Sequence, residues 1–208
     1  YRLDVSVSCE LGMAKAMSGQ KTVTPTAAGL AASVSAAKTR GLPPVESWNP
    51  PFCGDIDMEI KRDGTWFHEG TPIGRRGLVK LFASILIREG DKYFLVTPVE
   101  KVGIRVEDAP FIAIDFEAEG KGRAQKLTFQ TNLDDIATAS EDLPIRVVRD
   151  PETGEPSPYV RVRRNREALI DRKSFYRLVD LGEHHDGWFG VWSSGQFFGL
   201  IPSNELPE

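Results

Sequence analysis

The chain has 208 residues, 40% of them hydrophobic, which suits one large or two small domains with a buried core. Its formal net charge of −4 and pI near 5.5 argue against a general nucleic-acid-binding protein, which is usually basic. No apolar run reaches the roughly 18 residues that a membrane-spanning helix needs, so we expect neither a nucleic acid nor a membrane as partner.

Residues 1–40 are expected to be a disordered or fragmentary lead. Small residues dominate the stretch from Ser18 to Ala37, and such a stretch cannot bury enough apolar surface to offset the entropy cost of ordering. A frayed helix over residues 27–38 is the most regular element that the lead can form. Met13 and Met17 are both plausible starts of the natural protein. Removal of the lead is therefore expected to change the melting temperature by only a few degrees.

Residues 41–54, GLPPVESWNPPFCG, form a proline-rich linker that carries two large aromatic residues, Trp48 and Phe52. Proline stiffens the backbone and favours extended geometry in the preceding residue, so this segment is expected to dock on the folded body. Two interpretations remain open. The two aromatic side chains either cover the edge of a core or form the wall of a ligand cleft.

A hairpin and a helix are expected next. Ile56–Ile60 alternates in hydrophobicity like a half-buried strand, and Asp63-Gly64 is a two-residue turn signal leading into a second strand over 65–68. Further along, apolar residues recur at the spacing of a helix with one buried face, and Gly90-Asp91 is expected to end this helix. The residues of this apolar stripe are Leu78, Leu81, Phe82, Ile85 and Leu86.

The rest of the chain is rich in predicted strands. They cover residues 93–99, 104–106, 110–117, 125–131 and 144–148. A second helix with Asp171 as N-cap follows, and the chain closes with a hairpin over 188–201. The sequence therefore predicts an α+β fold of two small domains, each with a largely antiparallel sheet and one main helix. The expected domains are residues 41–110 and 111–208.

The segments 55–96 and 159–192 have similar patterns, which indicates an internal duplication. Each reads as strand, turn, strand, helix, turn and strand. The aligned positions include Ile73 with Ile170 and Tyr93 with Trp188. We expect the two segments to superpose, with each helix burying its apolar face on its own sheet.

Both predicted helices begin with basic residues, Arg75-Arg76 in the first and Arg172-Lys173 in the second. The partial positive charge of a helix N-terminus disfavours cations by about 0.3–1 kcal/mol per group, so something should compensate. An anionic ligand is one answer, because a helix N-terminus with glycines and arginines is suited to binding anions. Pairing with acidic residues of the fold is the other. The candidate partners are Asp55, Asp57, Asp171 and Glu69.

Known catalytic and metal-binding motifs are largely missing from the sequence. The loop 70–76 has neither the ending of a phosphate-binding loop nor the glycine spacing of a dinucleotide fold, so no cofactor is predicted. Cys9 and Cys53 form no disulfide framework or zinc pattern, which fits a reducing cytoplasm as the compartment. The run His184-His185-Asp186 is interpreted as a solvated cap at a helix C-terminus, with a metal ligand as the weaker alternative.

The strings WNPPFCGDI at 48–56, GTPIGR at 70–75 and TPVEK at 97–101 resemble a bacterial family known as domain of unknown function 1285. The resemblance extends over about residues 42–202. It implies a duplicated two-domain α+β fold whose second domain is superficially like a pleckstrin-homology fold. It also implies a nucleotide-like ligand between the domains and a signalling role, with no established enzymatic activity.

Our functional hypothesis is a protein that binds an anionic, nucleotide-like small molecule between its domains in a sensing or signalling role. The candidate ligand-binding residues are Trp48, Phe52, Asp55, Asp57, Arg75, Lys101, Arg105 and Arg172. One alternative is an enzyme acting on such a molecule through Asp55, Asp57, Cys53 or His68. Another is a protein-interaction module, for which the sequence identifies no partner.

Overall fold

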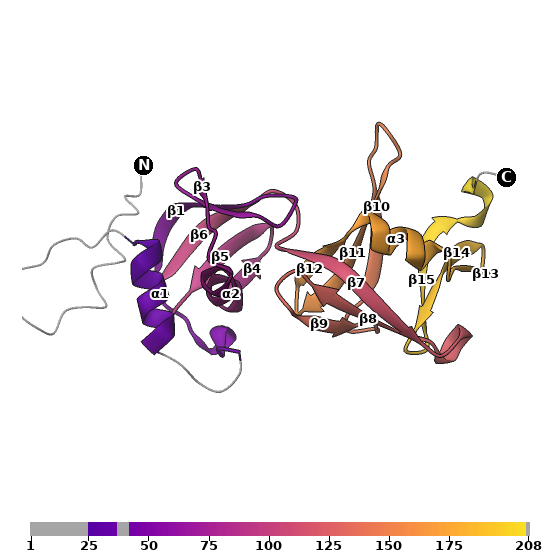
Figure 1. Cartoon of the computed structure of the whole chain (residues 1–208), viewed down its shortest axis with the longest axis horizontal. Helices are drawn as coiled ribbons and strands as arrows, with labels where there is room; N and C mark the ends of the chain where they lie inside the picture. Colours follow the sequence, from indigo (N-terminus) through magenta and orange to yellow (C-terminus); the bar gives the residue numbers. More distant parts are fainter. Residues whose placement is uncertain (1–24, 37–41, 207–208) are drawn as a thin grey trace, which may run out of the picture. The chain divides into compact units, whose positions relative to one another are not determined.

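The computed structural model describes residues 25–36 and 42–206, which divide into two compact units (Figure 1). Unit 1 contains the described residues up to Lys61 and residues 65–107, and unit 2 contains residues 62–64 and the chain from Asp108. The expectations for residues 1–24, with Cys9, Met13 and Met17, and for 37–41 concern residues outside the described part of the chain. Within the described part, no helix is long and apolar enough to cross a membrane.

Unit 1 is built on a six-stranded sheet with the order β3-β2-β1-β6-β5-β4. Its strands are β1 (Phe52–Ile60), β2 (Trp66–His68), β3 (Thr71–Pro72), β4 (Leu86–Glu89), β5 (Lys92–Val96) and β6 (Lys101–Val106). All neighbours are antiparallel except the central pair, β1 and β6, which is parallel. The sheet therefore consists of two three-stranded meanders joined at its centre.

Helix α2 (Arg76–Ser84) connects the two meanders of unit 1. The fully buried Phe82 stacks on Trp66 of β2, with ring centroids 6.3 Å apart, and Val79 is buried beside it on the same helix. The prediction that this helix continues to Gly90 is wrong. Residues 86–89 instead form β4, which pairs with β5 across the turn at Gly90. The spacing of the apolar residues around Ile85 is compatible with both a helix and a strand. Pairing with β5 favours the strand.

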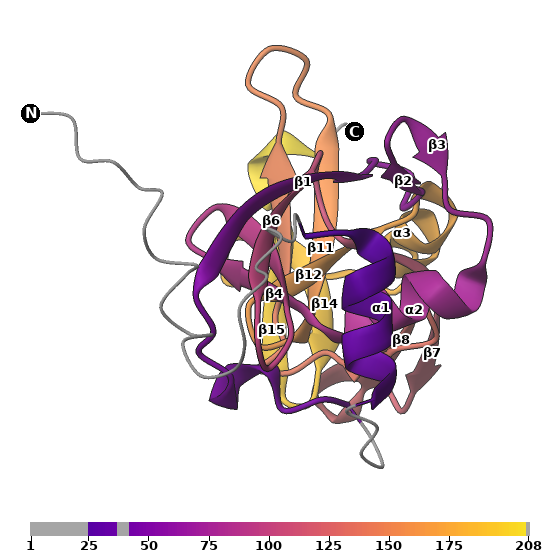
Figure 2. The same ribbon diagram turned by 90° about the vertical axis from the view of Figure 1, so that its left-hand side faces the viewer.

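Helix α1 (Ala27–Ala36) forms where we expected a frayed helix over residues 27–38, within the segment expected to be a disordered or fragmentary lead. Leu30 and Val34 on this helix are buried, with 0% and 3% of their surface exposed. Helix α1 packs against α2, and Figure 2 shows the two helices side by side. Two large side chains one helical turn apart are enough to anchor a helix that otherwise consists of small residues. A short 3₁₀ helix, η1 (Val45–Ser47), follows before β1.

Unit 2 repeats this strand arrangement in a second six-stranded sheet with the order β10-β11-β12-β7-β8-β9. Its strands are β7 (Phe111–Glu119), β8 (Lys126–Thr131), β9 (Ile136–Thr138), β10 (Ile145–Arg149), β11 (Pro156–Arg163) and β12 (Arg166–Ile170). Again only the central pair, β7 and β12, is parallel. Helix α3 (Arg172–Val179) follows the last strand of this sheet.

A separate three-stranded antiparallel sheet completes unit 2. It consists of β13 (Glu183–His185), β14 (Trp188–Ser193) and β15 (Gln196–Pro202). The predicted closing hairpin is thus present. Short 3₁₀ helices lie at η2 (Gly122–Ala124) and η3 (Ser203–Glu205). His184-His185 belongs to β13, so its predicted place at a helix C-terminus is wrong, because α3 ends at Val179.

The α+β fold with an internal duplication is confirmed, although the helix-to-helix alignment is not. Strands β1–β6 correspond in sheet order to β7–β12, with the parallel pair at the same place. Helix α2 lies between the two meanders of its sheet, whereas α3 comes after both. Ile73 and Tyr93 are therefore not equivalent to Ile170 and Trp188. Both helices follow an antiparallel strand pair and begin with basic residues, so the local patterns match although their places in the sheets differ.

Candidate functional site

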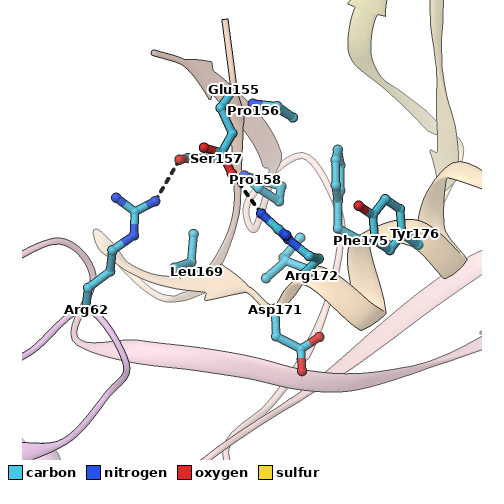
Figure 3. Close-up of a pocket in the computed structure, with 11 residues that line it drawn as sticks. Arg62, Glu155, Pro156, Ser157, Pro158, Leu169, Asp171, Arg172, Phe175 and Tyr176 are labelled. Atoms are coloured by element: carbon cyan, nitrogen blue, oxygen red, sulfur yellow. Dashed lines mark hydrogen bonds and ion pairs between the residues drawn. The ribbon is translucent and has the colours of Figure 1, made fainter. Parts of the chain in front are cut away.

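Unit 2 contains a pocket of about 340 Å³ beside the start of α3 (Figure 3). Its wall is formed by Arg62, the start of β11, the end of β12 and the first turns of α3. Its lining residues are Arg62, Glu155, Pro156, Ser157, Pro158, Leu169, Ile170, Asp171, Arg172, Phe175 and Tyr176. We call this cavity the unit 2 pocket.

Arg62 reaches the unit 2 pocket from the turn between β1 and β2. Its Nη2 donates a hydrogen bond to Ser157 Oγ at 2.9 Å, and its Nε lies 3.4 Å from Asp108 Oδ2. The turn needs Gly64, whose φ of +81° lies in the left-handed region and whose missing Cβ would come within 2.7 Å of Asn132. A glycine-dependent turn thus positions one cation of the pocket.

A buried tyrosine holds the carboxylate that faces Arg62. Tyr159 donates from its hydroxyl group to Asp108 Oδ1 at 2.7 Å, and the guanidinium of Arg146 lies over the Tyr159 ring at 4.5 Å. Arg146 is itself held by Glu167 through two hydrogen bonds of 2.6 and 2.7 Å. The pKa of Tyr159 is raised to about 12, mainly because the ring is buried and secondly because its hydroxyl group donates to Asp108. The phenol therefore stays neutral and keeps donating to Asp108 at physiological pH.

The raised pKa of Tyr159 predicts a loss of stability at high pH. The unfolded chain loses this proton near the ordinary tyrosine value of about 10, whereas the folded protein keeps it to about 12. The stabilisation is fully present below about pH 10 and is lost as the pH rises towards 12. Absorbance titration of the tyrosines should show a step near pH 12 that disappears in Tyr159→Phe. Tyr176→Phe is the control, because the Tyr176 ring is exposed, and the step near pH 12 should persist in this variant. If the step also persists in Tyr159→Phe, its assignment to Tyr159 is wrong.

Arg172 supplies the second cation of the unit 2 pocket from the first residue of α3. Its Nη2 lies 2.9 Å from Glu155 Oε1, with 76% of the Arg172 side chain and 65% of the Glu155 side chain exposed. An ion pair this exposed contributes about 0–1 kcal/mol, so it can open at little cost. Asp171 is the predicted N-cap and accepts from the backbone N–H of Ser174 at 2.7 Å. Its carboxylate points away from Arg172 (Figure 3).

The lining of the unit 2 pocket combines two cations, Arg62 and Arg172, and two carboxylates, Glu155 and Asp171, with neutral donors and an apolar wall. Arg62 and Arg172 come from distant parts of the sequence, and both guanidinium groups contact the same short stretch, residues 155–157. The hydroxyl groups of Ser157 and Tyr176 add polar atoms, and the prolines, Leu169 and Phe175 form the apolar part. Such a pocket can hold an anion on its guanidinium groups when Glu155 moves aside.

Seven of the eight predicted ligand-binding residues lie in unit 1. Asp57 and Arg105 form a 2.8 Å ion pair on neighbouring strands, and this hydrogen bond raises the pKa of Arg105. The Asp55 carboxylate lies against Gly103 of β6, where a Cβ would collide with it. Asp55 and Arg105 help to line a groove of about 520 Å³. Acidic residues outnumber basic residues in the lining of this groove, which makes it a poor place for an anion.

The aromatic and lysine candidates of unit 1 form a second small group. Phe52 meets Phe94 edge to face at 5.9 Å, and Lys101 lies over the Phe94 ring at 5.0 Å. Lys101 is also held by Glu89 at 3.0 Å. Trp48 is half-buried at the end of η1. Phe52 and Lys101 therefore make their contacts with other residues of unit 1, Phe94 and Glu89.

Arg75 is the N-cap residue of α2 and is exposed. Among the described residues its side chain has no hydrogen-bond or ion-pair partner, so pairing with Asp55, Asp57 or Glu69 is not observed. Arg75→Ala is therefore expected to change the free energy of unfolding by less than about 0.5 kcal/mol, in either direction. Chemical denaturation measures this. A loss of several kcal/mol would reveal a buried partner and contradict the exposed position.

The alternative chemical groups do not converge in the described residues. Residues 25–36 and 42–206 contain no cluster of three metal-binding side chains. His184 Nδ1 is 2.8 Å from Ser203 Oγ, and His185 packs between Trp192 and Phe197. Cys53 lies in β1 with its thiol 3.5 Å from the Pro51 carbonyl oxygen.

Of the predicted site residues, only Arg172 lines the unit 2 pocket. Sequence analysis missed Arg62, Glu155, Ser157 and Tyr176. The turn signal at Asp63-Gly64 located the loop that carries Arg62, but no sequence pattern connects that loop to β11. Glu155 and Ser157 lie in a polar proline-rich loop and at a strand start, which are ordinary surface features in sequence.

Comparisons with known proteins point to one family. The N-terminal domain model of a domain of unknown function, DUF1285, matches residues 43–109, and the C-terminal domain model of the same family matches residues 110–200. A crystal structure of a DUF1285 family protein from Silicibacter pomeroyi is 64% identical, covers 85% of this chain and 97% of its own, and superposes with a TM-score of 0.80. A DUF1285 family protein from Shewanella baltica is 31% identical over 59% of this chain and 90% of its own, with a TM-score of 0.48. No curated protein matches the chain.

Proposed function

The chain belongs to the DUF1285 family, and we propose that it binds an anionic small molecule in the unit 2 pocket as part of a sensing or signalling role. The observation that carries this proposal is the approach of two arginines, distant in sequence, to one three-residue stretch beside a helix N-terminus. Arg62 binds Ser157 and Arg172 binds Glu155 there. Guanidinium groups with adjacent hydroxyl and amide donors are typical of phosphate and carboxylate recognition.

The N-terminus of α3 supports the same ligand chemistry. Asp171 caps only the Ser174 amide, and Phe175 donates its N–H to the Asp171 carbonyl oxygen. The first two N–H groups of a helix have no partner inside the helix, and the helix dipole favours a negative charge near them. An anion in the pocket would also relieve the unfavourable placement of Arg172 in the first turn.

A nucleotide-like ligand fits the mixed lining better than a bare ion. The pocket places apolar surface from Pro156, Pro158 and Phe175 beside the cations. An aromatic base can pack on proline and phenylalanine while its phosphate contacts arginine. The enzyme alternative rests on Asp55 and Asp57, which lie in unit 1, where Asp57 is held by Arg105.

Calorimetric titration tests the proposal with adenosine monophosphate, inorganic phosphate and adenosine as probes. We expect both phosphate-bearing probes to bind, the nucleotide more tightly, and each affinity to fall with salt because exposed charges are screened. Arg62→Ala and Arg172→Ala should each weaken binding at least about tenfold, the loss of one charge-assisted contact of roughly 1.5–3 kcal/mol. Arg149→Ala is the matched control. Arg149 lies on the β10–β11 hairpin, which also carries Glu155 and Ser157, but it pairs with Glu205 outside the pocket.

Equal binding by all four proteins, or no binding of either phosphate-bearing probe, would contradict the proposed site. Turnover of the nucleotide that stops when Asp55 or Asp57 is replaced by Asn would support the enzyme alternative instead. Binding of adenosine as tight as that of the monophosphate would contradict the anionic character of the ligand.

A further inference from the structure

We infer that Glu155 is a built-in competitor for the anionic ligand: its carboxylate occupies Arg172 in the ligand-free protein, and the ligand must displace it. This inference rests on the proposed function of the unit 2 pocket and adds how that pocket is controlled. The residue belongs to the loop between β10 and β11, the long hairpin that projects from its sheet (Figure 1).

The Glu155 carboxylate lies where a ligand phosphate group would bind. It accepts from Arg172 Nη2 at 2.9 Å, and two residues further on Ser157 accepts from Arg62 at 2.9 Å. Residues i and i+2 of an extended chain point to the same side, roughly 7 Å apart at 3.3 Å per residue. The two guanidinium groups therefore contact neighbouring positions on one short segment of the chain. Figure 3 shows both arginine side chains directed to this stretch.

The loop presents Glu155 from an ordered turn. Asp150 Oδ1 accepts from the backbone N–H groups of Thr153 at 2.7 Å and Glu152 at 2.9 Å, and these bonds lower the pKa of the Asp150 carboxyl. The Asp150 N–H donates to the Glu155 carbonyl oxygen at 2.9 Å, and Gly154 adopts a φ of +72°. Because its backbone is fixed, Glu155 meets Arg172 as a tethered group at high effective concentration.

A tethered competitor lowers the apparent affinity without altering the ligand's own contacts. The Arg172–Glu155 pair is exposed, so it is weak enough for a ligand to open and strong enough to matter at low ligand concentration. When the pair opens, the Glu155 carboxylate is released from Arg172 at the start of α3. The occupancy of the pocket is thereby linked to the position of the Glu155 side chain, which gives a binding protein a structural response.

Three variants of the full chain test this inference with inorganic phosphate as the titrant at constant ionic strength. Glu155→Gln removes the competing charge and should raise the phosphate affinity about two- to fivefold, the range that corresponds to one surface ion pair. Glu155→Asp keeps the charge but shortens the side chain by one methylene group, so it should raise the affinity to a similar extent. Glu152→Gln removes a charge from the same loop and should leave the affinity within a factor of about 1.5.

The outcomes separate contact competition from simple repulsion. If Glu155→Gln and Glu152→Gln raise the affinity equally while Glu155→Asp does nothing, the effect is through-space repulsion and the inference is overturned. Unchanged affinity in both Glu155 variants, with Arg172→Ala still weakening binding, would overturn the competitor and leave the proposed pocket intact. If the wild-type protein binds no phosphate, and Glu155→Gln binds none either, both the pocket and its competitor are rejected.

Discussion

Replacing Phe82 with alanine should destabilise unit 1 by about 3–5 kcal/mol, the usual cost of deleting a buried phenylalanine. Phe82 has 0% of its surface exposed and stacks on Trp66 with an interplanar angle of 20°. Through this stacking it connects α2 to β2 of the first meander. The deletion leaves a cavity between helix and sheet that neither element can fill, because each is held by its own hydrogen bonds.

Chemical denaturation followed by tryptophan fluorescence measures this effect, since Trp66 is a direct neighbour of the cavity. Leu81→Ala is the matched control, because Leu81 lies on the same helix but is only half-buried. It should cost clearly less than Phe82→Ala. Equal losses in the two variants would mean that the stacked pair does not anchor α2.

Leu30→Ala should destabilise the protein by about 2–5 kcal/mol, because Leu30 has 0% of its surface exposed. This result would establish that α1 belongs to the folded body. The same change of an unburied leucine in a detached lead would have no effect on the free energy of unfolding. Thermal unfolding of the full chain provides the measurement.

An exposed position of α1 provides the control for Leu30→Ala. Ala32→Ser, on the opposite side of the helix, should change the free energy of unfolding by less than about 0.5 kcal/mol. If Leu30→Ala is equally silent, α1 does not contribute to stability, and the original expectation of a dispensable lead applies after all.

Much of the local structure could be predicted because local signals determine it. The turn at Asp63-Gly64 and the cap at Asp171 have distinctive residues, and both occur where expected. Strand β4 could not be recognised, because Ile85 and Leu86 fit the helical stripe that precedes them. The order of the strands in the sheets depends on pairing between distant segments, such as β1 with β6, which no local pattern encodes.

The candidate site was harder to predict than the fold. Basic residues at a helix start drew attention to Arg172, because the helix dipole makes that choice unfavourable without compensation. The same argument selected Arg75, which has no side-chain partner among the described residues and lies outside the unit 2 pocket. Arg62 has no such signal. Its role depends on the contact between the turn that carries Arg62 and Ser157 at the start of β11. These two residues are 95 positions apart in the sequence.

The most direct test of the proposed pocket is a nuclear magnetic resonance titration of the ¹⁵N-labelled full chain with inorganic phosphate at constant ionic strength. The resonances to follow are the backbone amides of Ser157, Arg172 and Lys173 and the Nε–H groups of Arg62 and Arg172. We predict that these signals shift together and saturate with a single dissociation constant. No saturable shift at these groups, or the largest shifts around Asp57 and Arg105 in unit 1, would contradict anion binding in the unit 2 pocket.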